Sequence, residues 1–325
     1  MHYKRNAEPR KTRRVAENFF GVVRRRAACI ADPQSNTSAL LRVLRGSALR
    51  LAMVALALSS AGAQQKYEVY AVRYATIPFK VSNLIMGADT SRKLDIAMMV
   101  ILIKGGGRNI LLDAGFYREK FMNQWKPQNY VRPDSAVLAA GVKPEDITDV
   151  IVSHVHWDHF DGADLFPKAR IWIQREEVEH YIDSTGARIT TDSAGRRMQN
   201  AMDQVDATML QAIRAAGRLQ LAPGDAKEII PGITVYTGGK HTWQSQYAGV
   251  RTIEGTVILA SDNVYLYENL DKHVPIAQTV DRESNVAAQD RMKTLASNPK
   301  LIVPGHDPAV FERFQSVKPN VVRIK

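Results

Sequence analysis

The most chemically informative part of the sequence is a short segment in which histidines and aspartates are dense. Three histidines and one aspartate occupy six consecutive positions, as His154, His156, Asp158 and His159, directly after the apolar run 150–152. Imidazole and carboxylate groups at this density suit a borderline divalent metal such as zinc. In an extended segment, side chains two positions apart point the same way, so His154 and His156 can reach one ion together. A turn after His156 would send Asp158 and His159 to a neighbouring ion.

Three further candidate donors lie downstream in a similar local setting. His241 and His306 each occupy a loop after a strand-like segment and lie close to a glycine, and Asp262 follows the apolar run 256–261. Glycine near a ligand lets the backbone turn sharply. Five histidines and two aspartates exceed the four ligands that close a structural zinc site, whereas two ions that share a carboxylate would use them all. We therefore expect two divalent metal ions, with zinc as the first choice and Mn, Co or Fe as alternatives.

The elements that must position these donors are predicted from hydrophobic periodicity. Apolar runs predict strands at 66–75, 96–103, 109–113, 149–153, 169–173, 229–236, 256–261 and 300–303. Helical patterns occur at 144–147, 174–182, 200–216 and 284–297. Strands that alternate with helices through most of the chain indicate a layered α/β domain with β-sheet in the middle.

Charge is distributed unevenly along the chain. The 325 residues have a formal net charge of +11, but residues 1–63 hold 12 Lys and Arg against 3 acidic residues, which leaves only +2 for residues 64–325. The folded part therefore lacks the basic surface expected of a nucleic-acid-binding protein, and we expect no nucleic acid partner.

The N-terminal segment is predicted to be a targeting signal. Three arginines between positions 42 and 50 precede the apolar run 51–58, and small residues follow up to Ala63. This order is typical of a secretory signal peptide, and the apolar run is too short to span a bilayer. We expect residues 1–63 to be a basic extension plus signal peptide, cleaved near Ala63 to leave a periplasmic or secreted chain without a stable membrane span. Residues 64–325 would form one hydrolase domain, which has no cysteine because the single one is Cys29.

The H-x-H-x-D-H motif at 154–159, its three downstream partners and the segment 111–115 resemble the metallo-β-lactamase superfamily. The resemblance covers residues 67–315 and implies an αβ/βα four-layer sandwich, with the metals at one edge of two packed sheets. It implies one metal held by His154, His156 and His241, a second held by Asp158, His159 and His306, and Asp262 as the bridge. The absence of cysteine from residues 64–325 sets the chain apart from members with a Cys ligand, which include many true β-lactamases.

Within the superfamily, the sequence is most similar to the N-acyl homoserine lactonases. The cues are the segment 157–162 and Tyr265, three residues after Asp262. The resemblance implies that the Tyr265 hydroxyl donates a hydrogen bond to the substrate carbonyl, which suits a developing oxyanion. The implied reaction is the opening of a lactone or ester ring by a hydroxide that bridges the metals, with Asp158 or Asp262 moving the proton. The leading substrates are N-acyl homoserine lactones, and the implied role is quorum quenching.

Three aromatic residues flank the candidate ligands. Trp157, Phe160 and Trp243 either form an apolar wall of the substrate pocket or pack around the metal loops. The remaining histidines of residues 64–325, His180 and His273, are better explained as a solvated helix face and a loop residue. Asp113 and Asp161 are expected to support the site rather than to bind a metal.

A helical insertion is expected around 175–225, because 81 residues separate His159 from His241. It could cover the site as a lid or form the interface of a homodimer. Its methionines Met198, Met202 and Met209 would line an acyl-chain channel or simply belong to the core.

Two other functions remain open from the sequence. The first is a hydrolase of the same fold that acts on a β-lactam, a thioester or a phosphodiester. The second is a non-catalytic, metal-dependent binding protein that keeps the ligands but has no open coordination position.

Overall fold

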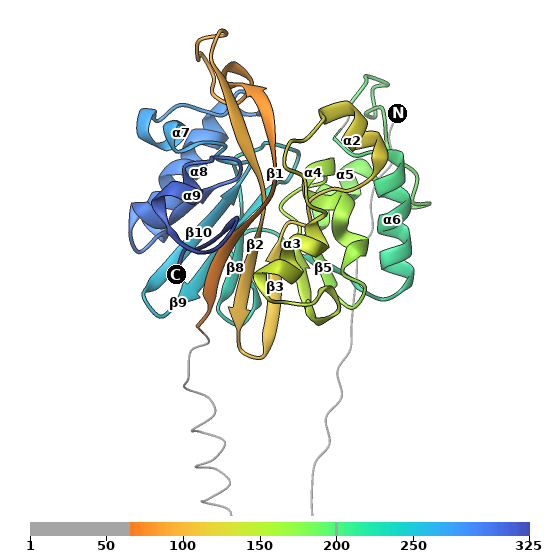
Figure 1. The fold of residues 1–325 in the computed structure, drawn as a ribbon. Helices are drawn as coiled ribbons and strands as arrows, with labels where there is room; N and C mark the ends of the chain where they lie inside the picture. Colours follow the sequence, from red (N-terminus) through yellow and green to blue (C-terminus); the bar gives the residue numbers. More distant parts are fainter. Residues whose placement is uncertain (1–65, 199–200) are drawn as a thin grey trace, which may run out of the picture. The chain divides into compact units, whose positions relative to one another are not determined.

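Two β-sheets pack against each other between layers of helices in the computed structural model (Figure 1). The structure describes residues 66–198 and 201–325. The predicted basic extension and signal peptide, residues 1–63, lie outside the described residues and stay a prediction. In the described parts, no helix is both long and apolar enough to cross a membrane.

The first sheet has eight strands in the order β12-β13-β1-β2-β3-β4-β5-β6. Their bounds are β1 Glu68–Lys80, β2 Lys93–Gly105, β3 Arg108–Leu112, β4 Asp149–Ile151, β5 Arg170–Gln174, β6 Leu219–Ala222, β12 Gln315–Lys318 and β13 Val321–Arg323. β1, β2 and β3 are antiparallel neighbours, whereas β3 to β6 run parallel. Parallel neighbours need crossover connections, and these place helices on the face of the sheet.

The second sheet has five strands in the order β11-β10-β9-β8-β7. Their bounds are β7 Lys227–Ile230, β8 Ile233–Thr237, β9 Gln246–Thr252, β10 Gly255–Ser261 and β11 Ile302–Pro304. β7 to β10 are antiparallel, and β11 joins β10 in parallel.

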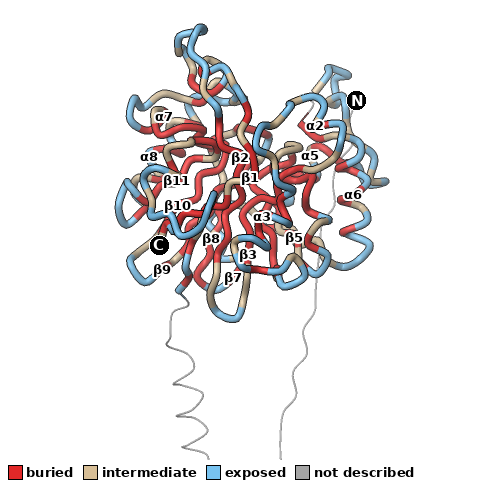
Figure 2. Tube along the Cα trace, viewed as in Figure 1, coloured by how far each residue is buried: buried red, intermediate tan, exposed pale blue. Residues whose placement is uncertain are grey.

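The core fills both faces of the first sheet, and Figure 2 shows the buried residues along its strands. Ile101 and Ile103 of β2 belong to the core between the two sheets, together with Val235 of β8. Val100 and Leu102 of the same strand belong to the core under the helices. A strand buried on both faces has a continuous apolar sequence rather than an alternating one, which explains the run at 96–103.

Helices cover the outer faces of the two sheets. Their bounds are α2 Glu119–Trp125, α3 Pro133–Ala140, α4 Trp157–Phe160, α5 Arg175–Tyr181, α6 Gln204–Ala215, α7 Tyr267–Lys272, α8 Arg282–Leu295 and α9 Val310–Arg313. α5 and α6 pack on the first sheet through Val178 and Leu210, and α8 packs on the second through Ala288 and Met292. The carboxylates of Asp203 and Asp281 cap α6 and α8. The predicted α/β sandwich with two central sheets is therefore confirmed.

Several predicted element boundaries differ from the structure. The strand expected at 229–236 is two strands, because Pro231 and Gly232, with φ 86° at the glycine, form a turn between β7 and β8. The insertion around 175–225 is not wholly helical, since β6 pairs in parallel with β5 and extends the first sheet. The expected helix at 144–147 is a single 3₁₀ turn, Pro144–Asp146. Strands β9, β12 and β13 and helices α2, α3, α7 and α9 have no counterpart in the sequence prediction.

Candidate metal centre

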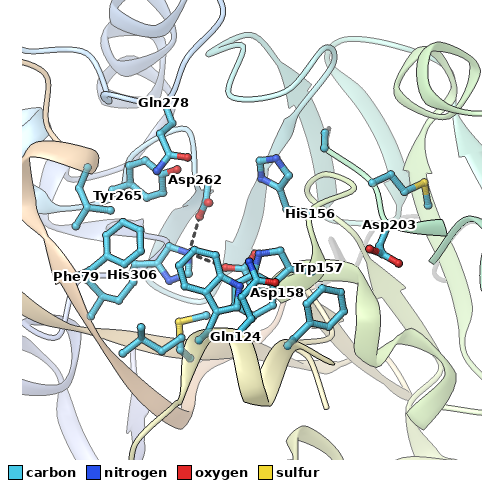
Figure 3. Close-up of a pocket in the computed structure, with 18 of the residues that line it drawn as sticks. Phe79, Gln124, His156, Trp157, Asp158, Asp203, Asp262, Tyr265, Gln278 and His306 are labelled. Carbon is cyan, nitrogen blue, oxygen red and sulfur yellow. Dashed lines mark ion pairs between the residues drawn. The ribbon is translucent and has the colours of Figure 1, made fainter. Parts of the chain in front are cut away.

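The seven predicted ligands converge at one end of the two sheets, in loops that follow strands. β4 leads into the segment 154–159, whose second half begins the short helix α4. His241 lies in the loop between β8 and β9, Asp262 follows β10, and His306 follows β11. Figure 3 shows His156, Asp158, Asp262 and His306 around one cavity.

The seven side chains form two groups that share one carboxylate. The first group is His154, His156, His241 and Asp262, and the second is Asp158, His159, Asp262 and His306. In each group the candidate ligand atoms lie within 4.8 Å of one another. Asp262 is common to the two groups, and the other members of each group are those that the resemblance assigned to one metal.

Interatomic distances within the groups are too short for independent surface residues. His156 Nδ1 lies 2.9 Å from His154 Nε2 and 2.8 Å from His241 Nε2. Asp262 Oδ1 lies 2.9 Å from His306 Nε2, and Asp262 Oδ2 lies 3.3 Å from His159 Nε2. Neutral imidazoles crowded in this way can share only one N–H proton per ring, whereas a cation would bind one nitrogen of each ring at once.

In three of the imidazoles, His159, His241 and His306, the nitrogen that points away from the centre is held by a polar contact. His241 Nδ1 faces the Gln278 carbonyl oxygen at 2.7 Å, and His306 Nδ1 faces the Ala97 carbonyl oxygen at 3.1 Å. His159 Nδ1 lies 2.8 Å from a carboxylate oxygen of Asp113. These contacts turn Nε2 of each ring toward the centre, an arrangement typical of metal-binding histidines.

Asp113 also joins the two sheets behind the ligands. It follows β3 in a left-handed conformation, φ 63°, and one of its oxygens accepts the Ser153 N–H at 2.8 Å. The Ser261 hydroxyl, at the end of β10, donates to its other oxygen at 2.9 Å. Asp113 thus supports the site without being a ligand, as its sequence context indicated. Asp161 likewise points away, toward the guanidinium of Arg118 at 2.6 Å.

The electrostatics of the first group suit a metal. Burial lowers the pKa of His154 well below its usual range, lowers that of His156 to about 3, and lowers that of His241. Neutral imidazole is the form that binds a metal. These three rings are therefore already in the required protonation state at neutral pH.

The second group carries charges that a cation would balance. Burial alone would lower the pKa of His159, but the nearby carboxylates of Asp262, Asp158 and Asp113 raise it well above its usual range. For His306 as well, the carboxylates of Asp262 and Asp158 outweigh the effect of burial and raise the pKa. Within the described residues, His159 Nε2 is buried without a hydrogen-bond partner. A buried nitrogen without a partner between two carboxylates fits a divalent cation at this place.

A cavity of about 300 Å³ adjoins the two groups (Figure 3). Four candidate ligands line it, His156, Asp158, Asp262 and His306, and so do the polar residues Lys120, Gln124, Asp203 and Gln278. The apolar part of its lining includes Phe79, Leu84, Met98, Phe121, Trp125 and Trp157. The Trp157 ring stacks on Trp125 and Phe121, with ring centroids 5.1 and 5.2 Å apart. The cavity can therefore hold a molecule with a polar end at the ligands and an apolar remainder.

Tyr265 lines the cavity beside the first group. Its hydroxyl lies 3.4 Å from His241 Nδ1. Burial, together with Asp262 and Asp158, raises the pKa of this phenol well above its usual range. The hydroxyl therefore keeps its proton and can act as a hydrogen-bond donor.

Two of the predicted substrate contacts lie elsewhere. Phe160 is fully buried in the core and is not among the residues that line this cavity, so the prediction of a substrate contact is wrong for it. Trp243 is 45% exposed and stacks on His180, with ring centroids 4.1 Å apart, away from the cavity. Of the four predicted aromatic contacts, Trp157 and Tyr265 line the cavity. His273 also lies outside the site, paired with Asp290 at 2.9 Å.

The insertion contributes one edge of the cavity. Ala201, Met202 and Asp203 line it, directly before α6. Met209 is buried in the core, and Met198 is partly buried against the same core. Of the three methionines considered from the sequence, Met202 reaches the cavity and the other two have packing roles.

Comparison with known proteins agrees with this geometry. The model of the metallo-beta-lactamase superfamily matches residues 99–306. An N-acyl homoserine lactonase from Bacillus cereus is 31% identical over 170 residues, which are 51% of this chain and 58% of that protein. The chain thus spans little more than half the length of that relative. The N-acyl homoserine lactonase AttM of Azorhizobium caulinodans is 24% identical over 272 residues, 76% of this chain and 95% of that protein.

Solved structures show the same fold. A Bacillus thuringiensis AiiA mutant with N-decanoyl-L-homoserine at its active site superposes with a TM-score of 0.62 at 20% identity, over 77% of this chain and 97% of that one. AidC, described as a dizinc quorum-quenching lactonase, superposes with a TM-score of 0.57 at 17% identity, over 74% and 88%. The family match spans more than half of the chain and includes all seven candidate ligands. The chain belongs to the metallo-beta-lactamase superfamily.

Proposed function

We propose that the protein is a metal-dependent hydrolase that opens the ring of N-acyl homoserine lactones. The observation that carries the proposal is the pair of donor groups that share Asp262 at the wall of a cavity with an aromatic side. Such a site offers two cation positions for the reacting carbonyl and an apolar space for an acyl chain. The relatives that are named N-acyl homoserine lactonases support the same reaction.

The ligands are assigned to two cations. His154, His156 and His241 would hold the first, Asp158, His159 and His306 would hold the second, and Asp262 would contribute to both. When bound, the two cations would supply an acidified water and a Lewis acid for the substrate carbonyl. Zinc is the proposed metal because neutral imidazole and carboxylate ligands suit it, and because the similar AidC structure is described as dizinc.

The remaining roles belong to side chains of the cavity. Tyr265 donates its hydroxyl proton in a hydrogen bond to the carbonyl oxygen, where negative charge develops during attack. Asp158 takes up the proton that the attacking water releases and returns it to the leaving alkoxide. The aromatic side formed by Phe121, Trp125 and Trp157 holds the acyl chain and keeps water from it. The described cavity needs no side-chain nucleophile, and residues 64–325 contain no cysteine.

We also propose that the enzyme acts outside the cytoplasm. The basic, apolar and small-residue regions that end at Ala63 support export. N-terminal sequencing of the periplasmic fraction after expression in a Gram-negative host tests this. A chain that stays in the cytoplasm with residues 51–63 attached contradicts it.

The reaction is tested with a small panel of substrates and protein of measured metal content. The panel holds an N-acyl homoserine lactone, a simple γ-lactone, nitrocefin, a thioester and a phosphodiester. We expect turnover of the homoserine lactone above the others, and loss of that turnover in the His154→Ala/His156→Ala variant. Preferred cleavage of nitrocefin, the thioester or the phosphodiester would replace the substrate assignment. No turnover by fully loaded protein would favour a metal-dependent binding protein.

A further inference from the structure

Glu177 is a buried carboxylate that lies outside both donor groups. It occupies the first turn of α5, and its side chain is fully buried. A carboxylate in the protein interior is unfavourable unless hydrogen bonds satisfy its oxygens. The identity of its partners therefore shows what this residue does in the fold.

All three hydrogen-bond donors to Glu177 come from the loops that carry the first donor group. The Thr242 hydroxyl donates at 2.5 Å and the Gln244 N–H at 2.6 Å, both from the loop that begins with His241. The N–H of Val155, which lies between His154 and His156, donates at 3.3 Å. One carboxylate thus connects the two loops on which all three histidines of the first group lie.

Other residues of α5 hold the same loop. The Trp243 N–H donates to the Tyr181 hydroxyl at 3.3 Å, and the Trp243 indole stacks on the His180 ring with an angle of 2° between the planes. The His241 N–H donates to Ser245 Oγ at 3.2 Å, which closes the loop on itself. The loop 241–245 is therefore fixed as a unit, and α5 sets where that unit lies.

We propose that Glu177 is a positioning residue for the first cation. By joining the loops 154–156 and 241–245, it holds His154, His156 and His241 in the arrangement that binds the ion. The inference rests on the proposed function, because it assigns these three histidines to a cation. Within the described residues, Glu177 forms no hydrogen bond with the histidines of the second group. The Asp113 carboxylate holds the His159 ring, and the Ala97 carbonyl holds the His306 ring. Loss of Glu177 should therefore weaken one cation and leave the other in place.

The test is the affinity of the protein for Zn²⁺ alone, measured by competition with a chromophoric chelator. Glu177→Gln is compared with the wild type and with Glu176→Gln, a matched control because Glu176 is exposed on the same helix. Glutamine keeps the size of the side chain, but its NH₂ group cannot accept a hydrogen bond. The measurement is made at about pH 8, above the pKa of about 7 to which burial raises Glu177. We expect the affinity for one of the two cations to fall about 10–100-fold in Glu177→Gln, and no change in Glu176→Gln.

A second variant keeps the inference testable if Glu177→Gln does not fold. Thr242→Val removes one donor to Glu177 without a change of shape, and we expect it to lower the affinity for the same cation about 3–10-fold. Excess Zn²⁺ should restore the activity of either variant, because the ligands themselves remain. Unchanged affinity for both cations, or an equal loss of both, would overturn the inference. Absence of lactone hydrolysis in the wild type would count against the proposed function alone, since the Zn²⁺ comparison does not depend on a substrate.

Discussion

Asp206 gives the sharpest prediction about pH, because it is a buried carboxylate with few compensating contacts. It lies in the first turn of α6 beside Asp161 and Arg118, and within the described residues neither of its oxygens has a hydrogen-bond partner. Arg118 Nη1 lies 3.9 Å from Asp206 but 2.6 Å from Asp161, so the guanidinium chiefly serves Asp161. Burial, reinforced by the charge of Asp161 and only partly opposed by Arg118, raises the pKa of Asp206 to about 8. A protonated Asp206 can donate to Asp161, whereas an ionised one has no donor.

The sign of the effect follows from where the proton is bound. Between about pH 4 and about pH 8 the folded protein keeps a proton on Asp206 that the unfolded chain releases. The free energy of unfolding therefore falls as the pH rises through this range. Above the pKa of Asp206 in the folded protein, the stabilisation by its bound proton is lost. From about pH 5.5 to about pH 8 the interval is about 2.5 pH units, which at about 1.4 kcal/mol per unit gives at most about 3.5 kcal/mol. The loss is about 3 kcal/mol, because the slope declines as the pH approaches the folded pKa.

The assay is urea unfolding of matched metal-loaded samples at about pH 5.5 and about pH 8.5. Asp206→Asn cannot ionise, so its stability relative to the wild type should rise by about 3 kcal/mol between the two pH values. Asp164→Asn is the control, because Asp164 also pairs with Arg118, at 2.9 Å, but its side chain is 36% exposed. It should follow the wild type. Parallel pH profiles for the wild type and Asp206→Asn would refute the reasoning.

Three further predictions concern the site itself. Tyr265→Phe should lower kcat about 100-fold while the metal content stays unchanged, because it removes a donor to the developing oxyanion; an unchanged kcat in steady-state lactone hydrolysis would rule this role out. Asp262→Asn should retain fewer than two cations per chain after dialysis, measured by elemental analysis, since this carboxylate belongs to both donor groups; two retained cations would show that it is not shared. Gly162→Ala should lower stability by about 1–3 kcal/mol in urea unfolding, because the added Cβ would lie 2.3 Å from the Ala114 carbonyl oxygen; a stability equal to that of the wild type would contradict the packing.

The ligands could be predicted from the sequence because each has a local signal. His154 and His156 follow an apolar run, Asp262 ends another, and His241 and His306 lie close to glycines in loops after strand-like segments. Loops after the strands of an α/β sandwich meet at one edge of the sheets, so the local signals translate directly into a shared site. The division into two groups around Asp262 came from family resemblance, and the geometry agrees with it.

The cavity wall could not be predicted in the same way. Phe79 comes from the end of β1, and Phe121 and Trp125 come from α2, a helix without a recognised pattern. Tertiary packing brings these side chains close to Trp157, and residue spacing in the sequence does not predict such contacts. The prediction that Phe160 contacts the substrate rests on its position next to a ligand in the sequence. That position does not fix which way its side chain points, and in the short helix α4 the side chain points into the core.

The position of the donors also connects the site to the stability of the whole domain. The segment 154–159 follows a strand of the first sheet, whereas His241, Asp262 and His306 follow strands of the second. The contact of Ser261 with Asp113 links the two sheets directly behind the ligands. A cation held by ligands from both sheets can bind only when the two sheets are packed together. The unfolded chain has no equivalent site for it. Binding free energy at such a site adds to the stability of the packed sandwich in proportion to the logarithm of the free cation concentration. The same argument bears on the many ionisable groups buried at this edge, because bound cations would provide partners for His159 Nε2 and Asp262 Oδ1, which have no hydrogen-bond partner within the described residues.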